Sequence, residues 1–367
     1  MDDLLTAVAV SMLPVSRLRA AASFKEAVHS GAREPLQRVL EACRIPAHSQ
    51  AGRDAVALAL ERAHQALQAR STVGLDAVPF GDSRYPPLLA CIPDPPPVLW
   101  LRGEPACLEA PAVAVIGSRA ASPYALQVGR RIAAELGGRG IVVVSGLARG
   151  VDSAAHEGCL EADGTTVAVI GSGHDRLYPR EHEALARRIS AKGLVISELA
   201  PGAKPLAEHF PLRNRIISGI SFAVVVVEAS EKSGSLITAA CALRQGRDVM
   251  AVPGSVLTGR NRGSHGLLKD GAKVVESADD ILEDMAWMSC GPRSGGSGKR
   301  SSKSLTDDPL LSRMEIGEVY RLDDLAAATG ISASKLLPRL MELELLGLIE
   351  APGGGRFIRP APVIRVG

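Results

Sequence analysis

Cysteine is scarce and widely spaced in this chain of 367 residues. The six cysteines include no Cys-x-x-Cys pair; they are Cys43, Cys91, Cys107, Cys159, Cys241 and Cys290. A disulfide framework or a zinc ribbon needs cysteines at close, regular spacing, so we expect neither of them. Dispersed thiols suit a reducing compartment, and we expect a cytoplasmic protein.

The chain also lacks a large excess of charge and a long hydrophobic run. Its 42 Lys and Arg residues against 40 Asp and Glu residues leave a net charge of +2. A surface for nucleic acid would therefore require local clustering of basic residues. No apolar run reaches the roughly 18–20 residues that cross a bilayer, and the first residues, MDDLLTAVAV, lack the basic start of a signal peptide. We expect no contact with a membrane.

The composition changes along the chain and predicts four parts. Residues 1–72 have apolar residues at helical spacing and predict a small helical domain of the SAM-like kind. Residues 73–110 are rich in proline, so we expect no helix and no central strand there but a strap that ends in an edge strand. Residues 289–304 resemble a flexible polar linker, and residues 305–367 show a winged-helix pattern.

Between these parts, residues 73–288 predict a Rossmann-like core. Short apolar runs alternate with helical segments there; the runs are 113–116, 141–144, 166–170, 194–196, 223–227, 248–252 and 273–275. This alternation predicts right-handed βαβ units and an α/β fold with a doubly wound, mostly parallel sheet. In such sheets, ligands bind beyond the carboxyl ends of the strands.

The stretch 210–240 has the strongest binding signal. A buried strand, FAVVVVE at 222–228, follows a cluster that contains an aromatic ring, two guanidinium groups and an amide: Phe210, Arg213, Asn214 and Arg215. A turn of small residues comes after the strand and opens a helix; its candidate ligand contacts are Ser233, Gly234, Ser235 and Thr238. Free N–H groups at a helix N-terminus bind anions, so this stretch predicts a phosphate-rich ligand.

Three other loops follow predicted strands and have similar residues. Their candidate contacts are Gly117, Ser118 and Arg119 in the first loop, Ser145, Gly146 and Arg149 in the second, and Gly171, Gly173, Tyr178 and Arg180 in the third. Glycine permits close approach of a ligand to the backbone, and arginine can contact phosphate with two parallel hydrogen bonds. Arginines beside Tyr178 and Phe210 indicate a groove for single-stranded nucleic acid, because only unpaired bases can stack on aromatic rings.

Other kinds of site fit the sequence less well. The pair Gly171 and Gly173 has Arg176 where a dinucleotide-binding motif needs its third glycine, and the chain has no Walker motif. A nucleotide-processing enzyme would need an acid–base pair, for which Asp152, His156 and Glu228 are candidates. We interpret Asp152 as an N-cap or loop-fixing residue beside an ordinary surface histidine, and we see no partner for Glu228.

We therefore expect no catalysis, cofactor or metal. The dipeptide His174–Asp175 predicts a turn and not a pair of metal ligands. A phosphoribohydrolase turn departs from this sequence two residues after Pro253.

These motifs, in this order, resemble the DNA-processing protein A (DprA/Smf) family. The matching stretches are VAVIGSR ending at 119, SGLARGVD ending at 152, GSGHDRLYP ending at 179, FPLRNRII ending at 217, SGSLITA ending at 239 and VPG ending at 254. The resemblance implies a Rossmann-like core that binds single-stranded DNA without catalysis. It also implies protection of incoming DNA in natural transformation, loading of the RecA recombinase onto that DNA, and a homodimer formed through the core.

Matched motif by motif, the resemblance assigns phosphate contacts to Arg119, to the turn at Gly171 and Gly173, and to Arg180. The turn from Ser233 to Thr238 would add N–H and hydroxyl contacts. Leu267, Leu268 and Ile281 are candidates for the dimer interface or for the core.

The winged-helix segment is acidic. Residues 305–367 contain seven Lys or Arg and nine Asp or Glu, with Glu342 and Glu344 on the presumed recognition helix. A reader of duplex DNA should be basic there, so we predict a protein-contact or regulatory domain.

Overall fold

The computed structural model has two compact units, residues 1–291 and 292–367. The residues that the structure describes are 3–72, 74–285, 311–314, 318–329, 336, 340, 343, 349–353 and 356–359. The predicted linker 289–304 and the acidic pair Glu342 and Glu344 lie outside them.

The first unit is built on a nine-stranded sheet with the order β1-β2-β6-β5-β4-β3-β7-β8-β9. Its strands are β1 Asp76–Pro79, β2 Val98–Gly103, β3 Ala112–Ile116, β4 Val142–Ser145, β5 Thr166–Ile170, β6 Leu194–Ser197, β7 Ala223–Val226, β8 Asp248–Ala251 and β9 Lys273–Val274. Strands β3 to β9 are parallel, β2 pairs antiparallel with β6, and β1 pairs antiparallel with β2 at the edge. The predicted doubly wound Rossmann-like sheet is confirmed.

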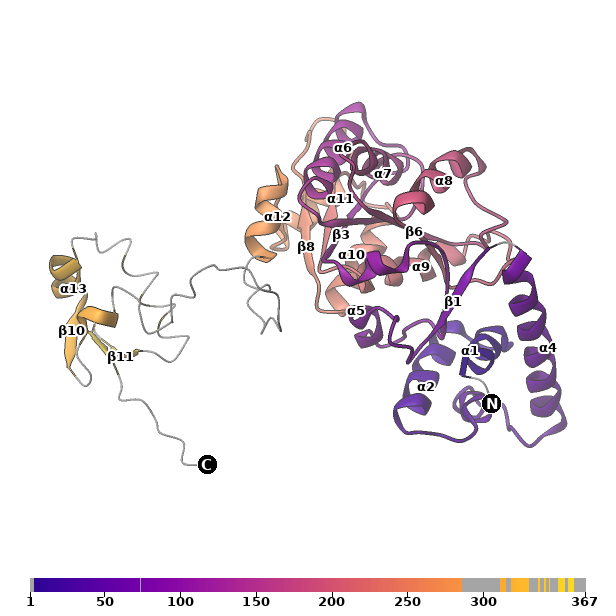
Figure 1. Ribbon diagram of the computed structural model, residues 1–367. Helices are drawn as coiled ribbons and strands as arrows, with labels where there is room; N and C mark the ends of the chain where they lie inside the picture. Colours follow the sequence, from indigo (N-terminus) through magenta and orange to yellow (C-terminus); the bar gives the residue numbers. More distant parts are fainter. Residues whose placement is uncertain are drawn as a thin grey trace. The chain divides into compact units, whose positions relative to one another are not determined.

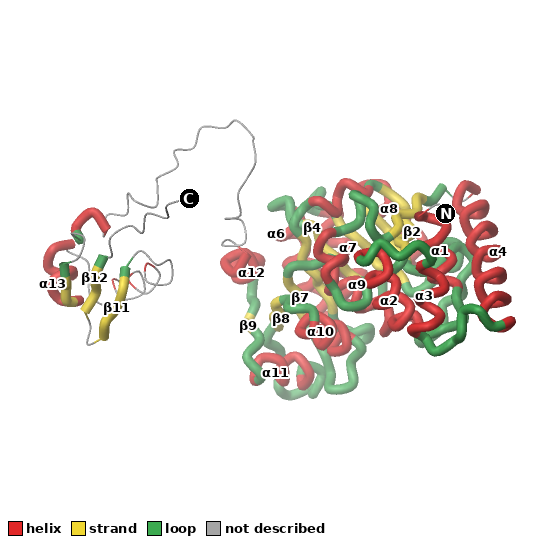
Figure 2. The backbone as a smooth tube through the Cα atoms, turned by 90° about the horizontal axis from the view of Figure 1, so that it is seen from below, coloured by secondary structure: helices red, strands yellow, loops and turns green. Residues whose placement is uncertain are grey.

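Helices cover both faces of this sheet (Figure 1). The helices of this unit are α1 Asp3–Met12, α2 Arg17–His29, α3 Pro35–Ala42, α4 Gln50–Thr72, α5 Pro87–Cys91, α6 Pro123–Gly137, α7 Val151–Glu161, α8 Glu183–Lys192, α9 His209–Gly219, α10 Ser235–Arg244, α11 Arg262–Lys269 and α12 Ala278–Met285. Figure 2 shows the same elements from below, with the strands enclosed by helices.

Alternation along the strands explains the two covered faces. Val113 and Val115 of β3 belong to a core cluster with residues of α6, α7 and α12, whereas Ala114 and Ile116 belong to a cluster with residues of α9 and α10. Successive side chains on a strand point to opposite faces, so the unbroken β-branched runs are buried on both sides. Ile281 is fully buried in the first cluster and is a core residue.

The N-terminal helices share a core with the sheet. Ala7, Val8 and Phe24 belong to the same buried cluster as residues of β1 and β2. The Phe24 and Phe80 rings meet edge to face at 6.5 Å, and Lys25 Nζ donates to the Ile92 carbonyl at 2.8 Å. The helical character of this segment is confirmed, and the boundary at residue 72 stays a prediction.

Two expectations about the proline-rich segment are wrong. Its last strand, β2, lies between β1 and β6, so the edge strand is β1. The segment also forms helix α5, because Pro87 occupies the first turn, where a missing N–H breaks no helical hydrogen bond.

The second unit contains a three-stranded sheet with the order β10-β12-β11 and a short helix. Its elements are β10 Val319–Arg321, α13 Leu322–Thr329, β11 Glu350–Gly353 and β12 Arg356–Ile358. Leu325, Leu336 and Phe357 belong to its buried core. Within the described parts of the chain, no helix combines the length and the apolar character that crossing a membrane requires.

Candidate functional site

The switch point of the sheet lies between β3 and β7. From β3 the chain proceeds outward through β4, β5 and β6, and from β7 it proceeds in the opposite direction through β8 and β9. The loops after β3 and β7 therefore diverge at the carboxyl edge, where open α/β sheets bind their ligands. The Ser118 amide donates to the Glu228 carbonyl at 2.8 Å and joins the two loops at their base.

A pocket of about 350 Å³ opens at this switch point. Ten of the predicted site residues line it: Gly117, Ser118, Arg119, Phe210, Arg213, Asn214, Ser233, Gly234, Ser235 and Thr238. They come from the loop after β3, from α9, from the turn between β7 and α10, and from the first turn of α10. The structure thus brings together segments that are more than a hundred residues apart in the sequence.

The turn after β7 presents the N-terminus of α10 to the pocket. The hydroxyl oxygens of Ser233 and Ser235 lie 2.7 Å apart, and Asn214 Nδ2 donates to the Gly234 carbonyl at 3.4 Å. A Cβ at Gly234 would meet no atom within 4 Å, so this glycine faces open space. Hydroxyls and backbone N–H groups at the start of a ten-residue helix make an anion-binding surface.

Alternating arginine and aromatic side chains continue from the pocket. The Arg119 guanidinium lies 5.3 Å from the ring centre of Phe210, which meets the Tyr178 ring at 5.6 Å and 61°. The Arg149 guanidinium lies 6.0 Å from the ring centre of Tyr178. We call Arg119, Phe210, Tyr178 and Arg149 the arginine–aromatic ladder. Tyr178 is 43% exposed, so an unpaired base could reach it from solvent.

The arginines at this edge differ in whether a carboxylate of the protein already pairs with them. Arg149 makes two hydrogen bonds to Glu181, of 2.7 and 2.9 Å, and these bonds raise the pKa of Arg149 and lower that of Glu181. Arg119 and Arg180 are exposed and make no ion pair with any residue in the described part of the chain. Arg119 and Arg180 are therefore the arginines most available to an external phosphate.

Of the five arginines predicted as ligand contacts (Arg119, Arg149, Arg180, Arg213 and Arg215), Arg213 and Arg215 are buried, at 6% and 4% exposed. Arg213 lines the bottom of the pocket and donates to the carbonyls of Gly146 (2.5 Å) and Val169. Burial lowers its pKa to about 10. Two residues further along α9, Arg215 points about 200° away around the helix and does not line the pocket.

Arg215 belongs instead to a buried ion cluster. Its guanidinium lies 2.7 Å from Glu198 Oε1 and 3.5 Å from Asp94 Oδ2. We therefore correct its assignment from a DNA contact to a structural residue.

Several predicted loop residues support the site from behind. Ser145 is fully buried, and its hydroxyl donates to the Val115 carbonyl at 2.7 Å. A Cβ at Gly146 would lie 2.5 Å from the Arg213 Cζ, one at Gly171 would lie 3.1 Å from the Phe210 ring, and one at Gly173 would lie 2.7 Å from the Ala200 carbonyl. Close packing inside the protein therefore explains why glycine stands at these positions. A side chain at Gly146 would collide with Arg213, and one at Gly171 would press against Phe210.

The three candidate acid–base residues already have internal roles or lack access to the pocket. Asp152 Oδ2 accepts the Gly146 amide at 3.1 Å, which confirms its loop-fixing role, and burial raises its pKa. His156 is fully buried, so its expected surface position is wrong; burial lowers its pKa to about 3. Glu228 is 1% exposed and accepts from the Ser122 amide (3.1 Å) and hydroxyl (2.6 Å), a partner that the sequence did not reveal.

Sequence reasoning missed Glu181, Ser230 and Ile237. Ser230 and Ile237 line the pocket, and Glu181 pairs with Arg149. The position of Ile237 in the first turn of α10, between Ser235 and Thr238, was a usable signal. The pairing of Glu181 with Arg149 needs the fold, since 32 residues separate them.

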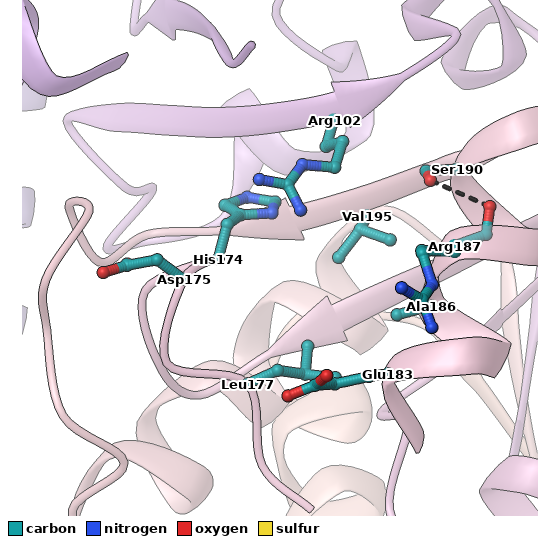
Figure 3. Close-up of a pocket in the computed structure, with 9 residues that line it drawn as sticks. All are labelled: Arg102, His174, Asp175, Leu177, Glu183, Ala186, Arg187, Ser190 and Val195. Atoms are coloured by element: carbon teal, nitrogen blue, oxygen red, sulfur yellow. Dashed lines mark hydrogen bonds between the residues drawn. The ribbon is translucent and has the colours of Figure 1, made fainter. Parts of the chain in front are cut away.

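A second pocket, of about 250 Å³, lies between β2 and α8 (Figure 3). Arg102 and His174 stand on one side of it, and Arg187 stands on the other. Two arginines are balanced by Asp175 and Glu183, so this pocket has no excess positive charge.

The dipeptide His174–Asp175 forms a turn, as predicted. His174 Nε2–H donates to the Trp100 carbonyl at 3.0 Å, and burial lowers the histidine pKa to about 4. Asp175 Oδ1 accepts the Gly202 amide at 2.7 Å. Over the residues that the structure describes, no group of three or more His, Cys, Asp or Glu side chains could hold a metal ion.

Comparison with known proteins identifies the family. Residues 76–286 match the family model of DNA recombination-mediator protein A, and residues 300–355 match that of the DprA winged helix domain. The chain is 39% identical over 295 residues to Protein Smf of Escherichia coli, covering 78% of this chain and 79% of that protein. It is 45% identical over 206 residues to DNA processing protein DprA of Streptococcus pneumoniae, covering 56% and 73%.

Solved structures agree with this match. The X-ray structure of DprA from Streptococcus pneumoniae superposes with a TM-score of 0.65 at 35% identity, covering 75% of this chain and 95% of that one. DprA from Helicobacter pylori, whose structure describes a single-stranded DNA binding mode, gives a TM-score of 0.53 at 28% identity, covering 58% and 96%. The predicted fold class, including the winged helix, is confirmed, and the chain belongs to the DNA recombination-mediator protein A (DprA/Smf) family.

Proposed function

We propose that this protein binds single-stranded DNA along the carboxyl edge of its sheet and acts as a recombination mediator. The observation that supports this most directly is the arginine–aromatic ladder beside the anion-binding turn at the switch point. Phosphates would contact Arg119, Arg180 and the turn at Ser233–Ser235.

The ladder favours an unpaired strand over a duplex. Stacking on a ring contributes about 1–3 kcal/mol per base and requires a base outside a duplex. Tyr178 and Phe210 offer such rings beside guanidinium groups. The single-stranded DNA binding described for the Helicobacter pylori relative supports the same ligand here.

Binding without catalysis fits the internal roles of the candidate acids. Asp152 holds the Gly146 amide, and Glu228 holds Ser122. By the family resemblance, the proposal includes protection of incoming DNA, loading of RecA and a homodimer through the core. The excess of acidic residues in 305–367 adds a protein-contact or regulatory role for the winged helix. Leu267 and Leu268, partly buried on α11, stay candidates for the dimer interface.

The test removes the two free arginines together. Arg119→Ala with Arg180→Ala should weaken binding of a single-stranded oligonucleotide. It should also flatten the plot of log affinity against log salt by about 1.4, because each lost phosphate contact on a single strand contributes about 0.7. Fluorescence anisotropy at several salt concentrations measures both effects.

The matched control is Arg53→Ala with Arg62→Ala, which removes two exposed arginines from α4. The control should keep the affinity and the salt slope of the unmodified protein. Equal affinity and slope in the Arg119/Arg180 variant would exclude both arginines from the site.

A further inference from the structure

The loop between β8 and α11, residues 252–261, has an exposed apolar tip. Val256 is 80% exposed and Leu257 is 91% exposed, which makes them the two most exposed large hydrophobic residues in the described part of the chain. Exposed apolar side chains that lie together commonly mark a binding surface. The proposed function does not yet use this tip.

Hydrogen bonds hold both ends of this loop. The Tyr124 hydroxyl donates to the Pro253 carbonyl at 3.1 Å, and Asn261 Nδ2 donates to the Ser255 carbonyl at 3.4 Å. His265 Nε2 lies 3.1 Å from the Gly254 carbonyl, and a Cβ at Gly254 would lie 2.5 Å from Asn261 Nδ2. These contacts hold the base of the loop in place, so the tip is presented to solvent by an ordered support.

The loop lies directly beside the switch-point pocket. Arg260 NH1 donates to the carbonyl of Ala120, a residue that lines that pocket. On its other side, a groove of about 480 Å³ separates the loop from the turn after β7; its lining is Ser230, Glu231, Lys232, Leu257, Thr258, Gly259 and Arg262. Ser230 lines both this groove and the switch-point pocket, so the two adjoin at this residue.

The order of the strands places the arginine–aromatic ladder, the switch-point pocket and this groove one after another along the carboxyl edge of the sheet. Strand β8 pairs in parallel with β7, and Figure 2 shows the two strands beside each other near α10. From β5, whose loop contains Tyr178, to β8 there are four strand spacings, or about 19 Å. A strand of DNA laid along the carboxyl edge would pass the ladder, the switch-point pocket and then this groove.

The charge of the groove fits a polyanion. Lys232 and Arg262 line the groove together with Leu257 of the tip, and the acidic side chain that lines it is Glu231. The Arg262–Glu231 pair is loose, at 3.9 Å, and both side chains are about two-thirds exposed, so an incoming phosphate could replace the carboxylate. A groove that combines an apolar side chain, Leu257, with basic side chains suits a ligand that has both bases and phosphates.

We propose that the groove between the turn after β7 and the loop after β8, here called the β8 groove, binds the continuation of the same single strand. Bases contact Val256 and Leu257, and phosphates contact Lys232 and Arg262. This inference depends on the proposed function and extends its footprint by a second subsite. The position of the groove beside the pocket and its excess of basic over acidic side chains favour DNA over a protein as the occupant.

The test compares two lengths of oligonucleotide. Labelled single strands of about 6 and about 20 nucleotides bracket the roughly 4–16 nucleotides that single-strand-binding folds cover. Val256→Thr with Leu257→Gln should weaken binding of the longer strand about three- to tenfold and leave the shorter strand nearly unchanged. Arg262→Gln should reduce the salt slope for the longer strand alone, by about 0.7.

The matched controls are Leu58→Gln and Arg62→Gln on α4, which remove an exposed apolar and an exposed basic side chain far from the carboxyl edge. Both should bind both strands like the unmodified protein. Unchanged binding of the longer strand by the tip variant would overturn the β8 groove as a DNA subsite, and would leave a protein as its occupant. Failure of the unmodified protein to bind either strand would overturn the proposed function itself, so the two failures are distinguishable.

Discussion

At the scale of single residues, three arginines show why residue type alone does not define a site. Arg119 is exposed beside an aromatic ring, Arg213 is buried against carbonyl groups, and Arg215 is buried in an ion cluster. All three lie in stretches by which the sequence resembles the family. Arg119 is exposed in the loop after β3, whereas Arg213 and Arg215 are both buried on α9 and reach different partners because they lie on different faces of that helix.

Arg215→Ala should destabilise the protein by about 3–5 kcal/mol, because it leaves the buried Glu198 and the half-buried Asp94 without their cation. Urea denaturation measures this loss. Arg119→Ala is the matched comparison: it should change stability by less than about 0.5 kcal/mol, since the side chain is exposed and makes no ion pair with a described residue. A stable Arg215→Ala protein that had lost only its DNA affinity would contradict the structural role.

Two buried histidines make stability sensitive to acid. The Thr166 hydroxyl donates to the Val143 carbonyl at 2.7 Å, so it accepts from His156 Nδ1–H, and the opposite ring nitrogen is buried without a partner among the described residues. Burial lowers the pKa to about 3 for His156 and to about 4 for His174. Below the unfolded pKa of about 6.5, the unfolded chain takes up protons that the folded chain excludes.

Stability should therefore be complete above pH 6.5 and should fall as the pH drops from 6.5 towards 4, by up to about 1.4 kcal/mol per pH unit for each histidine. Urea titrations at several pH values measure the slope. His156→Asn keeps a donor near the Thr166 hydroxyl but cannot titrate, so its slope should be shallower. An equal slope in the variant and the unmodified protein would show that His156 is not responsible.

At the scale of elements, the site depends on loops that support one another. Gly150 has a φ of +83°, and a Cβ there would collide with the Ser118 carbonyl and lie 2.9 Å from that of Arg119. The loop after β4 thus packs against the loop that contains Arg119. Ser122 has a similar linking role, since its hydroxyl caps α6 at Ala125 and donates to the buried Glu228.

Gly150→Ala should weaken binding of single-stranded DNA several-fold by displacing Arg119, and should cost about 1–3 kcal/mol of stability. Gly246→Ala is the matched control, because Gly246 also has a positive φ, of 68°, but a Cβ there would meet no atom within 4 Å. The control should share part of the stability loss and keep the DNA affinity. Equal DNA affinity in both variants would show that the position of Arg119 does not depend on Gly150.

Most of the sheet could be predicted from the sequence, because buried parallel strands are short β-branched runs. The run 166–170 matches β5 in full, and the run 113–116 matches β3 within one residue. The positions of the binding loops followed from the same rule. The partners of Glu228 and Arg149 could not be predicted, since Ser122 and Glu181 lie 106 and 32 residues away and meet them only after folding. The edge position of β1 likewise depends on pairing with β2.

At the scale of the whole molecule, the near-neutral net charge conceals a local asymmetry. A total of +2 would not by itself attract DNA, yet Arg119, Arg180 and Lys232 are all exposed on loops at one edge of the sheet. Concentrating basic groups at one edge makes association dependent on salt even when the total charge is small. This arrangement is the physical basis of the proposed function.

The measurement that tests the account most directly is a titration of the unmodified protein against a labelled single strand and a duplex of the same sequence, at two salt concentrations, by fluorescence anisotropy. We predict tighter binding of the single strand, with an affinity that falls steeply as salt rises, because the ladder needs unpaired bases and the arginines release counterions. Binding of the duplex as tight as that of the single strand, or binding insensitive to salt, would contradict the account.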